Sequence, residues 1–205
     1  MIYPLGTSAA VIELAIAEVG TVEEGDNLTK YGEFTKANGL PWCGSFVNWV
    51  FAKSEVKIPS CVSTAMGAHK FKEISRWSNM PQLGYLAFMD FPHDGVDRIS
   101  HIGIVVGLMP NNQVLLIEGN TSGTGDQRNG GMVMVKVRHY GEEKKWSGSG
   151  FPNSHHTKVT FQRSPFQQRE TNLRRRRNGQ SQSPSSIMGK KFFSISHCRL
   201  YGWNY

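Results

Sequence analysis

The spacing of the apolar residues changes near Pro81, and this change limits the fold more than any other feature of the sequence. Before Pro81, apolar side chains recur three or four residues apart, which is the period of a helix. After Pro81, short runs rich in valine and isoleucine are separated by turn residues, which is typical of strands. Helices that precede a set of strands indicate the α+β class, with the helices packed on a small antiparallel sheet.

The boundaries of these elements follow from capping and turn residues. Serine and threonine favour helix starts, and glycine favours helix ends. The predicted helices cover about 8–20 (capped by Thr7 or Ser8 and stopped by Gly20), a short segment near 31–37, a segment that begins at or just after Cys43, and about 63–76 (capped by Ser63). The predicted strands cover 84–91, 100–108, 114–120 and 132–140.

The positive charge of the chain is concentrated at its C-terminal end. The net charge is +7, but residues 1–150 hold 13 basic and 15 acidic side chains, whereas residues 151–205 hold 10 basic and one acidic. The final segment includes four consecutive arginines (174–177) and stretches rich in serine and glutamine, a composition typical of disorder. We expect a folded domain over 1–145 and a basic, largely disordered tail over 146–205. The tail either contacts a polyanion or is solvated without a specific partner.

The N-terminal residues lack the features of a signal peptide. No basic region opens the chain, and Glu13 and Glu18 interrupt the apolar stretch. No run of about 20 apolar residues is present, so we expect no membrane span. The protein is expected to be a monomer that is made in the cytoplasm. If its substrate lies outside the membrane, another factor must deliver it.

Cys43 is the strongest candidate for a nucleophile among the three cysteines. A cysteine attacks a carbonyl as its thiolate, which a nearby imidazole or the positive end of a helix dipole stabilises. Cys43 follows Pro41 and Trp42 and opens an apolar helix, so its sulfur and its backbone N–H lie at such an end. Cys61 and Cys198 lack comparable surroundings. The alternative for Cys43 is a small buried core residue.

Three polar residues on neighbouring predicted strands form a candidate base and its support. His101 begins one strand, and Glu118 and Asn120 end the next, so antiparallel pairing brings them close together. Glu118 and Asn120 share one face if the strand continues that far. A carboxylate or amide behind an imidazole fixes its tautomer and orientation. The alternative is a histidine with a purely structural hydrogen bond.

Three segments around these residues resemble the CHAP domain, the cysteine, histidine-dependent amidohydrolase/peptidase family of the papain-like NlpC/P60 group. They are PWCGSFVNW (41–49), SHIGIVV (100–106) and LIEGN (116–120). The order of Cys, His, Glu and Asn also matches, as does the separation of 17 residues between His101 and Glu118. The resemblance covers about residues 8–140 and implies a papain-like fold.

The resemblance also implies a role for each residue of the predicted site. Cys43 is the implied nucleophile, and His101 is the implied base that activates it and then protonates the leaving amine. Glu118 is implied to orient or polarise His101. Asn120 is implied either to orient the imidazole or to help hold substrate. The implied reaction is hydrolysis of an amide bond in peptidoglycan through a thioester, without a cofactor.

Two aromatic residues flank the predicted cleft. Trp42 and Tyr31 are predicted to bind substrate, either by stacking on a sugar or by shaping a peptide groove; the alternative is that they belong to the core. Many members of the family have glutamine at the position of Trp42, where it assists an oxyanion hole. The backbone N–H of Cys43 is therefore expected to act there with another donor.

No metal site is predicted. Some phage members of the family bind calcium through a carboxylate-rich loop before the cysteine. The corresponding part of this chain offers only Glu23, Glu24, Asp26 and Asn27, which are not a spaced set of oxygen ligands.

The biological setting implied by the resemblance is a phage or bacterial peptidoglycan hydrolase. The segment NLTKYGEFTKANGLPWC (27–43) resembles forms common in phages of actinobacteria and in their hosts. A phage lysin released by a holin, or a virion-associated lysin, acts on the wall without a signal peptide of its own. One alternative is an amidase for a glutathionylspermidine-like amide. Another is a catalytically idle cell-wall-binding or virion structural protein.

Overall fold

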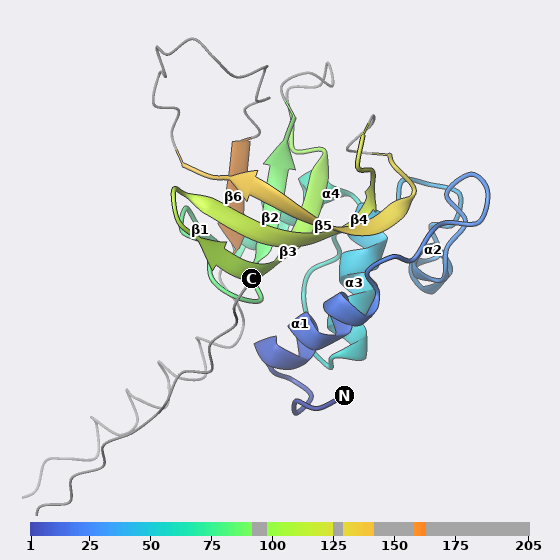
Figure 1. Ribbon diagram of the computed structural model, residues 1–205, viewed down its shortest axis with the longest axis horizontal. Coiled ribbons are helices and arrows are strands. Elements are labelled where there is room, and N and C mark those ends of the chain that lie inside the picture. Colours follow the sequence, from blue (N-terminus) through green and yellow to red (C-terminus); the bar gives the residue numbers. More distant parts are fainter. Residues whose placement is uncertain (92–97, 125–128, 142–157, 163–205) are drawn as a thin grey trace, which may run out of the picture.

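The computed structural model describes residues 1–91, 98–124, 129–141 and 158–162, which fold as helices packed on an antiparallel sheet (Figure 1). The helices are α1 (Ser8–Ala17), α2 (Lys30–Thr35), α3 (Cys43–Lys53) and α4 (Thr64–Glu73). The strands are β1 (Trp77–Ser78), β2 (Leu86–Asp90), β3 (His101–Met109), β4 (Gln113–Thr121), β5 (Met132–His139) and β6 (Lys158–Gln162). The α+β class predicted from the sequence is confirmed.

Side-chain capping explains where the first two helices begin. The Thr7 hydroxyl accepts a hydrogen bond from the Ala10 N–H, and the Thr29 hydroxyl accepts one from the Gly32 N–H. Ser63 occupies the cap position of α4, as predicted, but its side chain makes no capping bond. α1 ends at Ala17, three residues before the predicted stop.

The sheet has the order β1-β6-β2-β3-β4-β5, and all its described pairs are antiparallel. β3, one of its two central strands, pairs with β4, and in this pair Gly103 stands opposite Glu118. The strands β1 and β6 were not predicted. β6 lies within the segment interpreted as a disordered tail, yet it pairs with β2 from Asp90–Lys158 to Ala87–Phe161. The rest of the predicted tail lies outside the described residues.

The core forms mainly between α3 and the middle of the sheet. α3 lies against β3 and β4, and α1 packs on α3 and β3. Phe46 and Val47 of α3 share one buried cluster with Ile104 and Ile117 of the sheet. Because side chains alternate along a strand, the residues between these sheet positions point to the opposite face. That face carries a second, smaller buried cluster that includes Val105 and Leu116.

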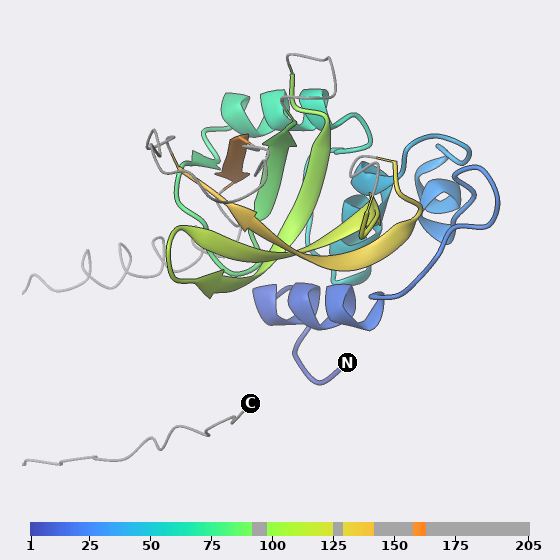
Figure 2. The same cartoon turned by 45° about the horizontal axis from the view of Figure 1, so that its top comes forward.

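One helix lies at the edge of the molecule. In both views α2 lies beyond α3, at the opposite end of the molecule from β1 (Figures 1 and 2). α2 packs mainly on α3. No helix within the described ranges is long and apolar enough to cross a membrane.

Candidate active site

Cys43 is the first residue of α3 and is 4% exposed. Trp42 takes the cap position and makes no side-chain hydrogen bond to the first turn, so the N–H groups of that turn are not used by a capping side chain. Free N–H groups and the helix dipole stabilise negative charge at this end of a helix. The predicted start of the helix at Cys43 is confirmed, and it places the sulfur where an anion is favoured.

Gly44 allows a second segment of backbone to approach the same turn. A Cβ atom on Gly44 would lie 1.8 Å from the carbonyl oxygen of Cys61 and 3.0 Å from the Cα of Val62. A side chain at this position is therefore excluded by backbone, which cannot move aside as the end of a flexible side chain can. The close approach fixes the Cys61–Val62 segment beside the cysteine.

Gly44→Ala is expected to destabilise the protein by about 3 kcal/mol, since the added methyl group overpacks a site walled by backbone. The measurement is the free energy of unfolding in urea, with Gly123→Ala as the matched control. A Cβ on Gly123 meets only the end of the Met134 side chain at 3.7 Å. The control should change the stability by less than about 0.5 kcal/mol. Equal effects of the two substitutions would contradict the packing described for Gly44.

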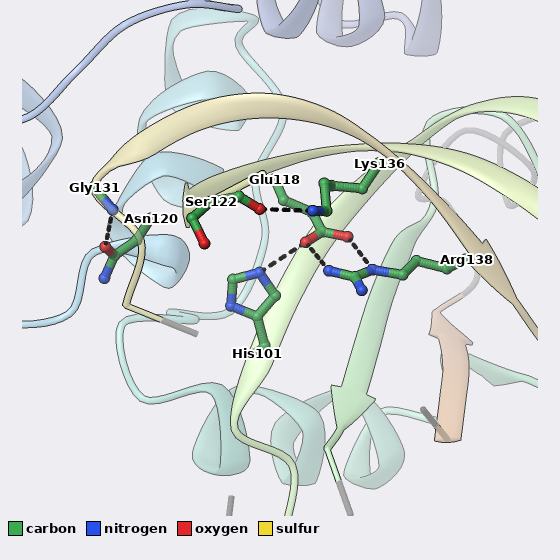
Figure 3. Close-up of polar contacts among 7 residues, drawn as sticks. All are labelled: His101, Glu118, Asn120, Ser122, Gly131, Lys136 and Arg138. Atoms are coloured by element: carbon green, nitrogen blue, oxygen red, sulfur yellow. Dashed lines mark hydrogen bonds and ion pairs between the residues drawn. The ribbon is translucent and has the colours of Figure 1, made fainter. Parts of the chain in front are cut away.

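His101 opens β3, and its side chain is fully buried. Its Nε2 lies 3.0 Å from Oε2 of Glu118 (Figure 3). Burial alone would lower the pKa of His101, but the electrostatic influence of nearby Cys43 and the hydrogen bond and charge of Glu118 outweigh it, so the pKa rises to about 9. Because Glu118 occupies Nε2, Nδ1 is the nitrogen left for the thiol. Nδ1 is buried and makes no hydrogen bond of ordinary geometry in the described part of the chain.

Glu118 lies fully buried between two positive groups. Its Oε2 accepts from His101, and both of its oxygens accept from Arg138 of β5, at 2.8 Å from Nε and 2.7 Å from Nη2 (Figure 3). Burial would raise the pKa of Glu118, but the hydrogen bonds from Arg138 and His101 and their charges lower it to about 2. Glu118 is therefore an anion at any pH near neutrality.

Gly103 gives Glu118 the room to reach His101. It stands opposite Glu118 in the ladder, and a Cβ on Gly103 would lie 2.8 Å from the Cγ of Glu118. The Glu118 side chain thus crosses β3 at Gly103, where only a glycine leaves enough space for it. The structure brings Cys43, His101 and Glu118 together, as the sequence predicted.

Asn120 is not part of the row formed by Cys43, His101 and Glu118. Its φ is +54°, and a register shift separates Glu118 from Thr121 in the pairing with β5, so the expected alternation of faces does not hold there. The Asn120 amide donates to Oδ1 of Asn129 at 2.9 Å and of Asn27 at 3.3 Å.

The remaining hydrogen bond of Asn120 also lies away from His101. Its Oδ1 accepts from the N–H of Gly131, and Figure 3 shows the side chain pointing to Gly131 and not to His101. The hydrogen bonds of Asn120 thus go to Asn27, Asn129 and Gly131 and not to His101, which speaks against its orienting the imidazole. The alternative role, in holding substrate, stays a prediction.

Tyr31 and Trp42 are also placed differently from the prediction. Both rings are fully buried and stack on each other, with centroids 5.3 Å apart. Their polar atoms have internal acceptors, since the Tyr31 hydroxyl donates to Glu18 and the Trp42 Nε1 donates to Glu23 at 2.7 Å. This burial corrects their predicted role as stacking surfaces for a sugar, because neither ring presents a face to solvent.

The acidic residues before Cys43 serve the fold in the same way. Glu23 accepts from Trp42, and Glu18 accepts from Tyr31 and pairs with Lys30 at 2.7 Å. In the described ranges, no three His, Cys, Asp or Glu side chains are grouped as a metal site would require.

Two residues of the site were missed from the sequence, Arg138 and Gly103. Arg138 lies on a strand that was predicted, but its contact with Glu118 depends on the pairing of β4 with β5. Gly103 stands within the motif SHIGIVV, and its spacing of two from His101 indicated a shared strand face. That signal was available, whereas the register of β5 against β4, which brings Arg138 to Glu118, could not be read from the sequence.

The comparisons with known proteins agree with this geometry. The model of one family, the CHAP domain, matches residues 35–120, a range that contains Cys43, His101, Glu118 and Asn120 but not Arg138. No curated protein and no solved structure matches the chain. Residues 35–120 therefore match the CHAP domain, and this match suggests a family of peptidoglycan amidases and peptidases.

Proposed function

We propose that this protein hydrolyses an amide bond of peptidoglycan, within the stem peptide or between sugar and peptide, with Cys43 as its nucleophile. The observation that carries the proposal is the buried row of Cys43, His101 and Glu118. A histidine whose pKa is raised by a neighbouring thiolate and a buried carboxylate is protonated at neutral pH. It can then give its proton to a leaving amine, which is the difficult part of breaking an amide.

The proposed reaction begins with attack on the amide carbon. The Cys43 thiolate forms a carbon–sulfur bond, and the backbone N–H of Cys43 donates to the developing oxyanion. When the carbon–nitrogen bond breaks, the His101 imidazolium transfers its proton to the leaving nitrogen, so that an amine departs and a thioester remains. Glu118 holds the ring in place during this transfer.

Water completes the cycle. Neutral His101 takes a proton from the water that attacks the thioester carbon, and the carbon–sulfur bond then breaks. The products are a carboxylic acid and the thiolate–imidazolium pair of Cys43 and His101, which is ready for another substrate. No electron is gained or lost overall, and the only co-reactant is water.

The proposal extends to the setting in which the enzyme acts. A phage lysin released by a holin, or one carried by a virion, would bring a protein of this kind to the wall. This part is supported by the resemblance of residues 27–43 to forms found in phages of actinobacteria. The basic residues of 146–205 would add contact with an anionic wall polymer.

Mass spectrometry of digested peptidoglycan tests the proposed reaction and identifies the bond. Purified cell walls treated with the full chain are expected to release fragments that gain one water at an amide. Free lactyl carboxylates on the sugar would identify an amidase, and new amino termini within the stem peptide would identify an endopeptidase. New reducing sugar ends without amide cleavage would contradict the proposal. Intact walls would instead favour an idle binding module.

A further inference from the structure

Arg138 meets Glu118 through both of its carboxylate oxygens. The guanidinium donates from Nε to Oε1 at 2.8 Å and from Nη2 to Oε2 at 2.7 Å. This two-point contact fixes both the position and the plane of a carboxylate, which a single point charge does not do. The Oε2 atom also holds His101, so the same contact fixes the acceptor on which the imidazole is oriented.

A buried carboxylate needs such a partner to remain charged. Glu118 is fully buried, and burial favours its protonated form. The charged groups that face it are His101 on β3 and Arg138 on β5, with Lys136 farther along β5. A neutral Glu118 could not stabilise the imidazolium, so the charge of His101 depends on the partner that Glu118 has on its other side.

Arg138 is itself held in place by a ring that also contacts the imidazole. Its guanidinium lies 5.3 Å from the centre of the Phe91 ring, and that ring lies 5.6 Å from the His101 ring. The Arg138 side chain is only 11% exposed. Arg138, Phe91, Glu118 and His101 thus form a closed group in which each member limits the movement of the next.

We propose that Arg138 is a positioning residue that holds Glu118 as an aligned anion behind His101, so that the imidazole keeps its orientation and its proton beside Cys43. This inference rests on the proposed function of the Cys43 row. It adds a residue of β5 that lies beyond the 35–120 range matched by the family model.

The test measures the rate at which iodoacetamide alkylates Cys43 in the full chain between pH 4.5 and 8.5, followed by mass spectrometry of the Cys43 peptide. In the wild type, Cys43 should react much faster than Cys61, which is fully buried and whose pKa is raised by that burial. In Arg138→Met, the fall of the alkylation rate on the acidic side of the profile (its acidic limb) should shift to a pH about one unit higher. At a given pH on that limb, the variant should therefore react about tenfold more slowly than the wild type. Arg138→Lys, which keeps the charge but loses the two-point contact, should fall between the two.

Two controls separate positioning from stability. Lys136→Met removes a positive charge from the same face of β5 without touching the Glu118 carboxylate, because the Lys136 amine donates to the Ser122 carbonyl. It should shift the profile much less than Arg138→Met does, because Lys136 interacts with Glu118 through its charge and not through a hydrogen bond. In a Glu118→Gln background, Arg138→Met should cause no further shift of the limb, because its effect passes through the carboxylate.

The outcomes distinguish this inference from the proposed function. If wild-type Cys43 reacts no faster than Cys61, the proposed function fails and the inference falls with it. If wild-type Cys43 is reactive but Arg138→Met and Arg138→Lys keep the wild-type profile, only the inference is overturned, even when their melting temperatures fall. Should Arg138→Met not fold, the profile of Arg138→Lys decides the outcome.

Discussion

Replacing Cys43 with alanine is expected to lower the hydrolysis of purified cell walls by at least about a thousandfold. Without the nucleophile, only binding and oxyanion stabilisation remain to assist water. The fold should survive, because the change removes a single sulfur atom from the first residue of α3, and the start of this helix does not depend on that side chain. The measurements are the loss of turbidity of a wall suspension and, in parallel, circular dichroism and the melting temperature.

Cys61→Ala is the matched control for this substitution. Cys61 is the other buried free cysteine within the described residues, and its thiol donates a hydrogen bond to the carbonyl of Pro59. Its replacement removes the same sulfur atom as Cys43→Ala does, and the Cys61 thiol makes no hydrogen bond to Cys43, His101 or Glu118. Cys61→Ala should therefore retain turbidity loss. Continued lysis by Cys43→Ala would exclude Cys43 as the nucleophile.

Long elements with a strong pattern could be predicted from the sequence, and they carry most of the site. The start of α3 at Cys43 follows from the apolar spacing after Pro41, and β3 and β4 follow from their β-branched runs. These are the elements whose own sequence buries an apolar face. Because an antiparallel pair brings the start of one strand near the end of the next, the closeness of His101 to Glu118 followed as well.

The elements that were missed owe their structure to partners. β1 has two residues, too few to show any period. β6 lies in a polar, basic part of the sequence, and its strand conformation depends on hydrogen bonds to β2 and β1. Such pairing is a property of the folded sheet and is not visible in the five residues themselves.

The errors at the site have related causes. The prediction for Asn120 assumed that side chains alternate to the end of β4, but the register shift and the positive φ at Asn120 turn its side chain away. The prediction for Tyr31 and Trp42 assumed exposed rings. Both could be buried only because Glu18 and Glu23, which are distant in sequence, accept hydrogen bonds from their polar atoms.

Removing the Glu118 carboxylate is expected to affect stability and activity together. Glu118→Ala leaves the guanidinium of Arg138 and the Nε2 of His101 buried without their acceptor, which should cost about 3–5 kcal/mol of unfolding free energy. Activity should fall by at least about a hundredfold, since the imidazole loses the group that fixes its tautomer. Glu118→Gln keeps the shape but not the charge, so it isolates the electrostatic part.

The stability that the Glu118 charge contributes has a defined pH window. The pKa of Glu118 is lowered from 4.5 to about 2 in the folded protein, mainly because hydrogen bonds from Arg138 and His101 overcome the effect of burial. A group with a lowered pKa stabilises the fold fully above its unfolded value and loses that effect as the pH falls through the folded value. The difference in melting temperature between wild type and Glu118→Gln should thus be constant above about pH 4.5 and shrink towards pH 2.

An exposed carboxylate provides the control for that window. Glu33 lies on the solvent side of α2, so Glu33→Gln leaves no buried partner unpaired and should melt close to wild type at neutral pH. A difference between wild type and Glu118→Gln that persists unchanged down to pH 2 would mean that the loss comes from shape and not from charge. The Arg138–Glu118–His101 row would then be a packing feature, and the charge of His101 would have to be maintained by Cys43 alone.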